Sequence, residues 1–91
     1  MLRESAIEKQ ACKAATLLGW WGIKLVPQFI SGLPDRMFIG HHKVVFVEFK
    51  TEKGKVSKIQ AYIHKKFKKY GHTVYIARSK DEMIRILNEQ K

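Results

Sequence analysis

The sequence predicts a single α/β domain in which helices flank a mixed central sheet, with the elements in the order α-β-β-β-α-β-α. Three observations lead to this fold class. The chain has 91 residues, the size of one domain, so we expect one unit over residues 1–91. Hydrophobic residues make up 45% of the chain, which is enough for a packed core and argues against disorder. Apolar residues follow helical spacing in some segments and form short β-type runs in others.

A helix is predicted at the start of the chain. Over residues 3–21 the apolar side chains recur every three or four positions, and Gly19 or Gly22 offers a place for the helix to end. Residues 23–29 are short and partly β-branched, which predicts a strand that stops around Pro27.

A β-hairpin is predicted next. Residues 36–39 and 43–50 form two arms around Gly40-His41-His42, and we expect the histidines to form the hairpin tip rather than bind a metal. Before the first arm, residues 31–35 have the glycine and proline of a tight turn. The second arm is apolar on both faces until Glu48, which is typical of a strand inside a sheet.

The second half of the chain predicts two capped helices with a strand between them. Ser57 and Gln60 form a capping-box pattern at the start of a helix that Gly71 ends. The apolar stripe of this helix is expected to pack on the sheet and consists of Ile59, Ile63, Phe67 and Tyr70. Residues 72–77 predict a strand, and a second capping box begins the last helix at Ser79.

The charge of the chain predicts an anionic partner. Eighteen Lys and Arg residues oppose eight Asp and Glu residues, which gives a net charge of +10. Such an excess on a small domain favours nucleic acid. The sequence has no apolar run of about 20 residues that could span a membrane, and no secretion signal is visible. The single cysteine, Cys12, excludes an internal disulfide, so we expect a cytoplasmic protein with Cys12 as a small core residue.

Two acidic residues and a lysine are placed as in a catalytic site. Asp35 follows a tight turn, and Glu48 lies near the end of the most apolar strand, where an ionised carboxylate needs a cation or a metal. The strand period places Glu48 and Lys50 on one face, and the hairpin can bring Asp35 beside them. Oxygen ligands of this kind suit Mg²⁺ or Mn²⁺. The simpler interpretations are a turn residue for Asp35 and a surface ion pair for Glu48 and Lys50.

At these residues the chain resembles a known family. Gly32-Leu33-Pro34-Asp35 followed by Val47-Glu48-Phe49-Lys50 resembles the motif of the PD-(D/E)XK nucleases. With Ser57-Lys58-Ile59-Gln60 downstream, and with Glu4 and Glu8 in the leading helix, the chain is similar to the stand-alone, virus-type VRR-NUC branch of that superfamily. The resemblance implies a restriction-endonuclease-like core and a metal-dependent DNA endonuclease of replication, repair or recombination. It also implies a bacterial, phage or prophage origin.

The resemblance implies a role for each residue of the motif. Asp35 and Glu48 would bind the Mg²⁺ or Mn²⁺ ion, together with the backbone carbonyl of Phe49. Lys50 would orient or activate the attacking water and offset negative charge in the transition state.

Two further residues are assigned to the site by the resemblance. Glu8 would hold a water on the metal or help to bind a second ion, although both Glu4 and Glu8 also suit the first turns of an ordinary helix. Gln60 would hold the water or the phosphate, although its place in a capping box is an equally good reason for a glutamine.

A lysine-rich segment is the predicted path for the phosphate backbone. Eight lysines lie between Lys50 and Lys69, opposed by Glu52 alone, and such a run can also be a solvated helix face. The expected nucleic-acid-binding residues are Lys53, Lys55, Lys58, Tyr62, Lys65 and Lys69. With no base-reading motif, we expect recognition of DNA shape rather than of sequence.

The assembly and the substrate follow from the number of sites. One domain holds one site, so paired cuts in both strands require two copies, which predicts a homodimer. Similarity to Holliday junction resolvases points to branched DNA. Trp20-Trp21 can pack in the core or in the dimer contact. The alternative function is a non-catalytic, basic nucleic-acid-binding module, and a further one is a subunit whose partner selects the substrate.

Overall fold

The computed structural model describes residues 2–26 and 28–90, and within them the elements follow the predicted order. The helices are α1 (Glu4–Leu17), α2 (Lys58–Lys69) and α3 (Lys80–Glu89), and the strands are β1 (Trp21–Lys24), β2 (Arg36–Gly40), β3 (Lys43–Phe49) and β4 (Val74–Ala77). In this part of the chain, no helix is long and apolar enough to cross a membrane.

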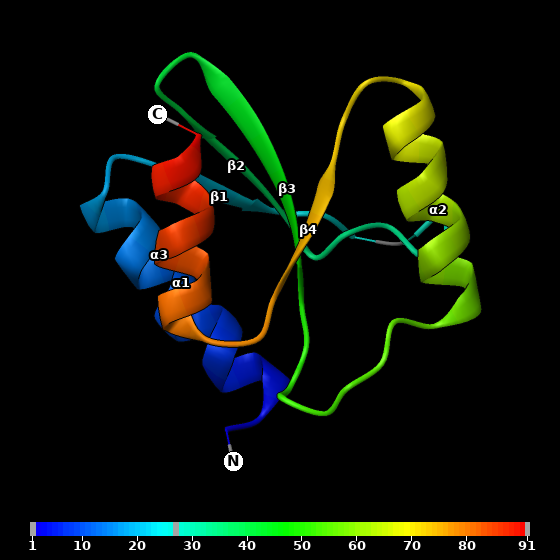
Figure 1. Ribbon diagram of the computed structural model, residues 1–91, viewed down its shortest axis with the longest axis horizontal. Helices are drawn as coiled ribbons and strands as arrows, with labels where there is room; N and C mark the ends of the chain where they lie inside the picture. Colours follow the sequence, from blue (N-terminus) through cyan, green and yellow to red (C-terminus); the bar gives the residue numbers. More distant parts are fainter. Residues whose placement is uncertain (1, 27, 91) are drawn as a thin grey trace.

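The four strands form one mixed sheet in the order β1-β2-β3-β4. Strand β2 is antiparallel to both β1 and β3, whereas β4 is parallel to β3. A parallel pair needs a crossover connection, and α2 provides it. Helices α1 and α3 cover one face of the sheet while α2 lies alone on the other face (Figure 1). The predicted mixed sheet flanked by helices is therefore confirmed.

The first helix ends four residues earlier than the predicted limit of Trp21. Gly19 takes a φ of +87°, and the backbone N–H of Trp20 donates to the Ala15 carbonyl over 2.9 Å. The N–H of Gly19 donates to Thr16, which completes a Schellman motif. This turn separates the two tryptophans, because Trp20 becomes buried while Trp21 begins β1 and is 67% exposed.

The second predicted element, the strand over residues 23–29, is wrong in both of its limits. Strand β1 begins at Trp21 and ends at Lys24, while residues 25, 26 and 28–30 lie outside any strand. Pro27, where we expected the strand to stop, lies outside the described residues. One hydrogen bond continues the pairing, from the N–H of Leu25 to the carbonyl of Asp35 over 3.0 Å. This bond fixes the backbone of Asp35, the residue that precedes β2.

The hairpin between β2 and β3 has the predicted two-histidine tip. His41 and His42 have φ values of 50° and 61°, as the two central residues of a type I′ turn require. The ring of His41 lies 5.0 Å from that of Trp20, and its Nε2 is 3.0 Å from the Leu18 carbonyl oxygen. These contacts explain His41 as a structural residue.

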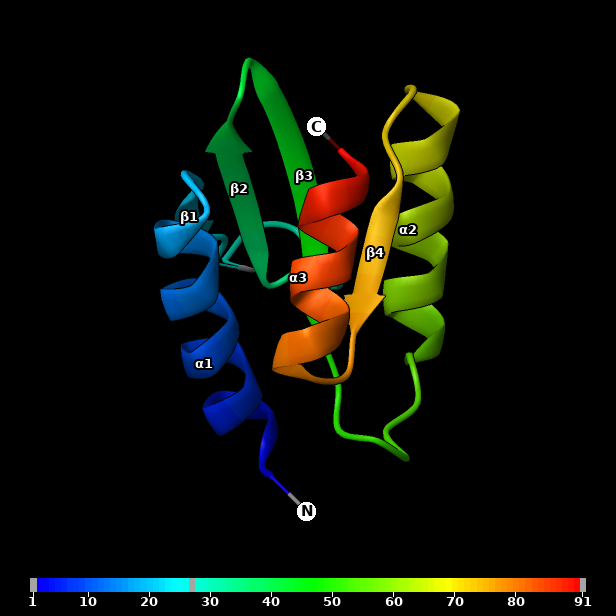
Figure 2. The same cartoon turned by 60° about the vertical axis from the view of Figure 1, so that its left-hand side comes forward.

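The main core lies between the sheet and the helices α1 and α3, which pack against each other (Figure 2). Cys12 packs against it from α1. The buried side chains of this core are Ile7, Ala11, Ala15, Trp20, Phe38, Val45, Val47, Phe49, Ala77, Met83, Ile86 and Leu87. The core side of β3 therefore holds Val45, Val47 and Phe49, and the alternate residues of this strand face α2.

The layer between α2 and the sheet is thinner than the sequence predicts. Ile63 is buried, and Phe67 packs edge-on against Phe46 with ring centroids 4.9 Å apart. The ends of the predicted stripe, Ile59 and Tyr70, are exposed, because α2 lies over β3 and β4 and leaves β1 and β2 bare on this face.

Candidate active site

Asp35 and Glu48 lie opposite each other where β2 begins and β3 ends. The register pairs Arg36 with Val47, so one step further places Asp35 across from Glu48, with both side chains on the α2 face. The Oδ2 atom of Asp35 accepts a hydrogen bond of 2.7 Å from the backbone N–H of Phe49. Asp35 is thus held at the end of β3 and is more than a turn residue.

The turn before Asp35 is pressed against the start of α2. Gly32 has a φ of +87°, and a Cβ atom at this position would lie 2.8 Å from the Ile59 carbonyl oxygen. Only glycine fits both the backbone conformation and this close approach. Pro34, two residues later, is fully buried. The Gly-Leu-Pro segment therefore fixes Asp35 relative to the helix that bears Gln60.

Glu48 is a buried carboxylate with one oxygen satisfied and the other not. Its side chain is 1% exposed. The Oε2 atom accepts a hydrogen bond of 2.8 Å from Nε2 of Gln60, whereas Oε1 is buried with no hydrogen-bond partner among the described residues. Burial, and next the charge of Asp35, raises the pKa of Glu48 to about 7, while Lys50 opposes the shift. Glu48 therefore lies in a site that needs more positive charge than the protein supplies.

Lys50 lies beside Glu48 with its ammonium group almost free. Its backbone N–H donates to the Ala77 carbonyl over 3.1 Å, which continues the β3–β4 pairing and keeps Lys50 on the face of Glu48. The Nζ atom is 3.7 Å from Glu48 Oε2, and the Lys50 side chain is only 11% exposed. The interpretation of Glu48 and Lys50 as a surface ion pair is therefore wrong.

Gln60 serves the helix and the site with different atoms. Its side-chain oxygen accepts from the backbone N–H of Ser57 over 3.0 Å, which completes the predicted capping box. Its Nε2 atom donates to Glu48. Capping and a place in the site, which the sequence left as alternatives, occur together.

The residues present fit a divalent ion of the Mg²⁺ class. Within the described ranges, no three His, Cys, Asp or Glu side chains gather as a metal cluster. Mg²⁺ commonly takes one or two carboxylates and keeps several waters, so Asp35 and Glu48 with the nearby Phe49 backbone carbonyl suffice. The unsatisfied Oε1 of Glu48 and the raised pKa of its carboxyl group both indicate that a cation would stabilise this arrangement.

The structure places Glu8 away from this site. Its Oε2 atom is 2.7 Å from Nε of Arg36 and 3.2 Å from Nζ of Lys24. Arg36 alternates with Asp35 along its strand, so Glu8 meets the sheet on the α1 face, opposite Glu48. Glu4, one turn earlier, is the acid of α1 whose charge adds to the raised pKa of Glu48. Of the two acids of α1, Glu8 is thus paired with Arg36, while Glu4 acts on Glu48 through its charge alone.

Sequence reasoning missed two residues that adjoin the site. Arg78, directly after β4, donates from Nη1 to the carbonyls of Thr51 and Gly54 over 2.8 and 2.6 Å, and so holds the loop that follows Lys50. His64 lies one turn after Gln60 on α2, and the charges of Lys50 and Asp35 both act on its ring. The spacing of four from Gln60 was the available signal for His64, whereas Arg78 had none.

The predicted nucleic-acid-binding residues are all exposed, as a phosphate path requires. They come from the loop after β3 and from one side of α2, and they are Lys53, Lys55, Lys58, Tyr62, Lys65 and Lys69. A shallow hollow on α2 is lined by Tyr62, Lys65, Lys66, Lys69 and Tyr70. An aromatic ring beside several ammonium groups suits a sugar-phosphate backbone.

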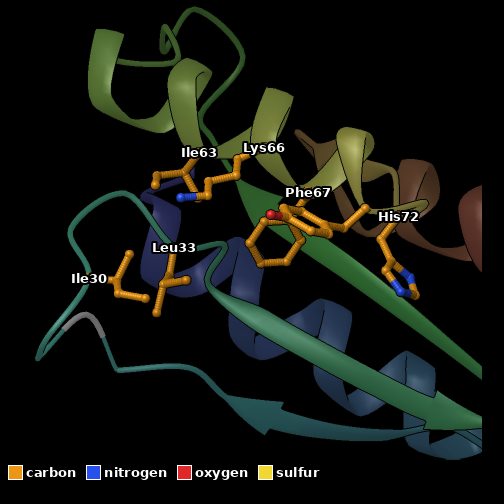
Figure 3. A pocket seen from close by; sticks show the side chains of 7 residues that line it. Ile30, Leu33, Ile63, Lys66, Phe67 and His72 are labelled. Carbon is orange, nitrogen blue, oxygen red and sulfur yellow. The ribbon is translucent and has the colours of Figure 1, made fainter.

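A separate apolar hollow lies between α2 and the loop that leads to Asp35 (Figure 3). It has a volume of about 390 Å³ and is lined by Ile30, Leu33, Ile63, Lys66, Phe67, Tyr70 and His72. None of the acidic residues of the site lines it. The hollow marks where the α2 layer is incompletely packed.

Comparison with known proteins supports a nuclease-type domain. A solved structure described as a VRR_NUC domain matches the whole of this chain, and the match covers the whole of that structure, with a TM-score of 0.87 and 27% sequence identity. No protein-family model matches the chain, and no curated protein matches it. The similarity therefore rests on the three-dimensional arrangement of the elements that hold Asp35, Glu48 and Gln60.

Proposed function

Because this chain is a VRR-NUC domain by its fold, we propose that it is a divalent-metal-dependent DNA endonuclease that hydrolyses phosphodiester bonds. One observation is the main support for catalysis. Asp35 and Glu48 face each other with Lys50 beside them, and Glu48 is buried with an oxygen that has no partner in the described residues. Burying such a carboxylate is costly, and a module that only binds DNA has no need of it.

Each side chain of the site has a distinct task in this proposal. Asp35 and Glu48, with the Phe49 backbone carbonyl, hold the Mg²⁺ or Mn²⁺ ion, and Gln60 fixes the orientation of Glu48 through its 2.8 Å hydrogen bond. The ion, when bound, supplies a water of lowered pKa and polarises the phosphoryl group. Lys50 would orient the attacking water and donate to the nonbridging phosphate oxygens, where negative charge develops.

An acid from α1 completes the set. The family resemblance assigned Glu8 to hold a water on the metal, but Glu8 is engaged by Arg36 at 2.7 Å. Glu4 is free of such a pairing among the described ion pairs, and its charge acts on Glu48. We therefore assign the water-holding role to Glu4.

The substrate is DNA whose backbone follows the exposed lysines of α2 and the preceding loop. The net charge of +10 and the absence of a base-reading motif favour recognition by phosphate contacts and by shape. We infer that branched DNA, of the Holliday junction type, is cut in preference to linear duplex. Such junctions present two equivalent strands, which suit two sites related by a two-fold axis.

A homodimer can form through the sheet face that α2 leaves bare. The register aligns Trp21 with Ile39 and Ile39 with Val44, so these three side chains form an apolar row across β1, β2 and β3. All three are exposed. We propose that this row, called here the sheet row, is the dimer contact. Trp20 is excluded from it because this residue is buried in the core.

The proposed activity is tested by cleavage of matched junction, flap and linear duplex DNA with Mg²⁺, Mn²⁺ or EDTA. We expect cleavage with either ion, none with EDTA, and a loss of at least 100-fold in Asp35→Asn and Lys50→Met. A gel shift in EDTA should show nearly unchanged DNA binding by both variants, since the exposed lysines supply the affinity.

The matched control is Lys13→Met, which removes an exposed lysine of α1 outside both the carboxylate pair and the expected nucleic-acid-binding residues and should retain most of the cleavage. Tight DNA binding without metal-dependent cleavage by the wild-type chain would replace the proposal with the non-catalytic module. Near-wild-type cleavage by Lys50→Met would show that the site is assigned wrongly.

A further inference from the structure

The side chain of Arg78 meets three backbone carbonyl groups of one turn. Its Nη1 atom lies 2.8 Å from the carbonyl oxygen of Thr51, 3.3 Å from that of Glu52 and 2.6 Å from that of Gly54. The N–H of Gly54 also donates to the Thr51 carbonyl over 3.1 Å, so residues 51–54 form a β-turn. The guanidinium group therefore lies where the carbonyls of this turn converge.

Arg78 connects the 51–54 turn to the rest of the protein. Within the described ranges, the hydrogen bonds between this turn and other elements all come from the Arg78 side chain. Hydrogen bonds from a charged donor are stronger than those between neutral groups. Arg78 is itself anchored, since its backbone N–H donates to Oε1 of Glu82 at the start of α3 over 2.6 Å. Without the guanidinium group, the turn would be attached through its covalent ends.

The 51–54 turn is coupled to Lys50 on two sides. It begins the connection from β3 to α2, directly after Lys50 (Figure 1). The backbone N–H of Lys50 donates to the carbonyl of Ala77, the residue before Arg78, so both ends of the clamp meet at the end of β4. A Cβ atom at Gly54 would lie 3.6 Å from Cβ of Lys50, which shows that the turn folds back against the stem of this lysine. A displaced turn would therefore displace Lys50.

We propose that Arg78 is a positioning residue, which holds the 51–54 turn at the end of β4 and thereby keeps Lys50 in the candidate active site. An arginine near a nuclease site could instead bind a phosphate group of the substrate, but here Nη1 is engaged by the three carbonyls. These contacts exist without DNA, so Lys50 is in place before the substrate arrives. The catalytic consequence rests on the proposed nuclease function, whereas the coupling between Arg78 and Lys50 does not.

The coupling is tested by amide hydrogen exchange of the metal-free protein, followed by NMR. Arg78→Met removes the donors to the turn, whereas Arg78→Lys supplies an ammonium group that can still donate to the carbonyls. We expect the amides of Lys50 and Gly54 to exchange at least tenfold faster in Arg78→Met and at nearly wild-type rates in Arg78→Lys. The amide of Phe38, in the middle of the central strand β2, should change little. The matched control is Lys13→Met, which also removes one positive charge and should leave all three rates unchanged.

Unchanged exchange of the Lys50 amide in Arg78→Met would overturn the proposal. Acceleration of Phe38 by the same factor as Lys50 would overturn it as well, because Arg78 would then stabilise the whole fold rather than this turn. Neither outcome depends on cleavage, so the coupling stands or falls separately from the nuclease activity.

The catalytic consequence is tested by single-turnover cleavage at saturating DNA and Mn²⁺. We expect the rate to fall about 10- to 100-fold in Arg78→Met, because misplacing a catalytic group by about 1 Å has an effect of up to this size. Arg78→Lys should recover most of the rate. The affinity for DNA in EDTA should fall no more in Arg78→Met than in Lys13→Met, which loses the same charge. Equal losses of rate in both Arg78 variants, or no loss in either, would contradict the positioning role, and a much larger loss of affinity in Arg78→Met would make Arg78 a DNA contact instead.

Discussion

The side-chain amide of Gln60 donates to Oε2 of Glu48 over 2.8 Å while the oxygen of the same amide accepts from the backbone N–H of Ser57. The capping box therefore orients the amide, and only one of its two ends is left to face the carboxylate. This arrangement ties the start of α2 to the end of β3. It also means that the structural and the catalytic contributions of Gln60 can be separated, since they belong to different atoms.

Gln60→Glu should impair cleavage more than it impairs the helix. A glutamate can still accept from Ser57, but it loses the donor to Glu48 and adds a third negative charge beside Asp35. We expect single-turnover cleavage to fall by at least tenfold and the free energy of unfolding at pH 8 to fall by about 1–3 kcal/mol, as for a buried acceptor left unpaired. Ser57→Ala is the control, because it should cost about 1 kcal/mol of stability through the lost cap and leave cleavage intact. Wild-type cleavage by Gln60→Glu would reduce Gln60 to a capping residue.

The stability of the metal-free protein should decrease as the pH rises from about 5 to 8. The pKa of Glu48 is about 7 in the folded protein against 4.5 for an unperturbed group, so the folded state binds the extra proton between these values. The contribution is fully present below pH 4.5 and is lost as the pH rises through about 7. Its size is about 3 kcal/mol. Urea unfolding at several pH values should show this decline in the wild-type protein and a flatter profile in Glu48→Gln, and an equal decline in both would assign it to other groups.

Substitution of the two acids of α1 should affect different properties, namely stability for Glu8 and cleavage for Glu4. Glu8→Gln leaves Arg36 without its 2.7 Å ion pair, so we expect a loss of about 1–3 kcal/mol in stability with little change in cleavage. Glu4→Gln should leave stability nearly unchanged, lower the affinity for Mn²⁺ and slow cleavage. Thermal unfolding with and without Mn²⁺ measures the stability and the effect of the ion on it, and cleavage at saturating Mn²⁺ measures the activity. A larger loss of cleavage in Glu8→Gln would restore Glu8 to the site.

The sequence predicted the parts of the site that depend on local rules. Strand alternation places Glu48 and Lys50 on one face, and the hairpin register brings Asp35 opposite Glu48. The choice between Glu4 and Glu8 depends instead on where α1 crosses the end of the sheet. Glu8 pairs with Arg36, whereas the charge of Glu4, one helical turn earlier, acts on Glu48. No local sequence pattern specifies where the helix crosses the sheet.

The limits of prediction were similar for α2. The apolar stripe of α2 is regular in sequence, but the sheet surface that can cover this stripe is small. Strand β4, which lies beneath the helix, has only four residues. Ile59 and Tyr70 remain exposed for this reason. His64 was overlooked because a histidine directly before two lysines resembles a solvated residue until the sheet is placed beside it. Tertiary packing therefore decided each of these points.

The lysines of α2 should control the salt dependence of DNA binding. Lys65 and Lys69 are exposed and line the same shallow hollow with Tyr62. Each phosphate contact contributes about −0.9 to the slope of log K against log salt on duplex DNA. Lys65→Met with Lys69→Met should therefore flatten this slope by about one to two and weaken binding equally for unrelated sequences. Fluorescence anisotropy at several salt concentrations measures the slope, and an unchanged slope would mean that this side of α2 faces only solvent.

Disrupting the sheet row should separate the dimer into monomers without unfolding the chain. Ile39 occupies the middle of the row between Trp21 and Val44, so Ile39→Lys places a charge at the centre of the proposed contact. The side chain is already partly exposed, and a lysine there can reach water in the monomer. We expect light scattering to show a dimer for the wild-type protein at micromolar concentration and a monomer for Ile39→Lys.

The same substitution should remove the preference for branched DNA. A monomer brings one Asp35–Glu48–Lys50 site to the substrate, so paired cuts in a four-way junction should give way to single nicks. Leu17→Lys is the matched control, because this residue is 83% exposed at the end of α1, away from the sheet row, and should leave both the dimer and paired cutting unchanged. A wild-type monomer, or equal rates on junction and linear duplex, would refute the dimer and its substrate preference while leaving the assignment of the metal site intact.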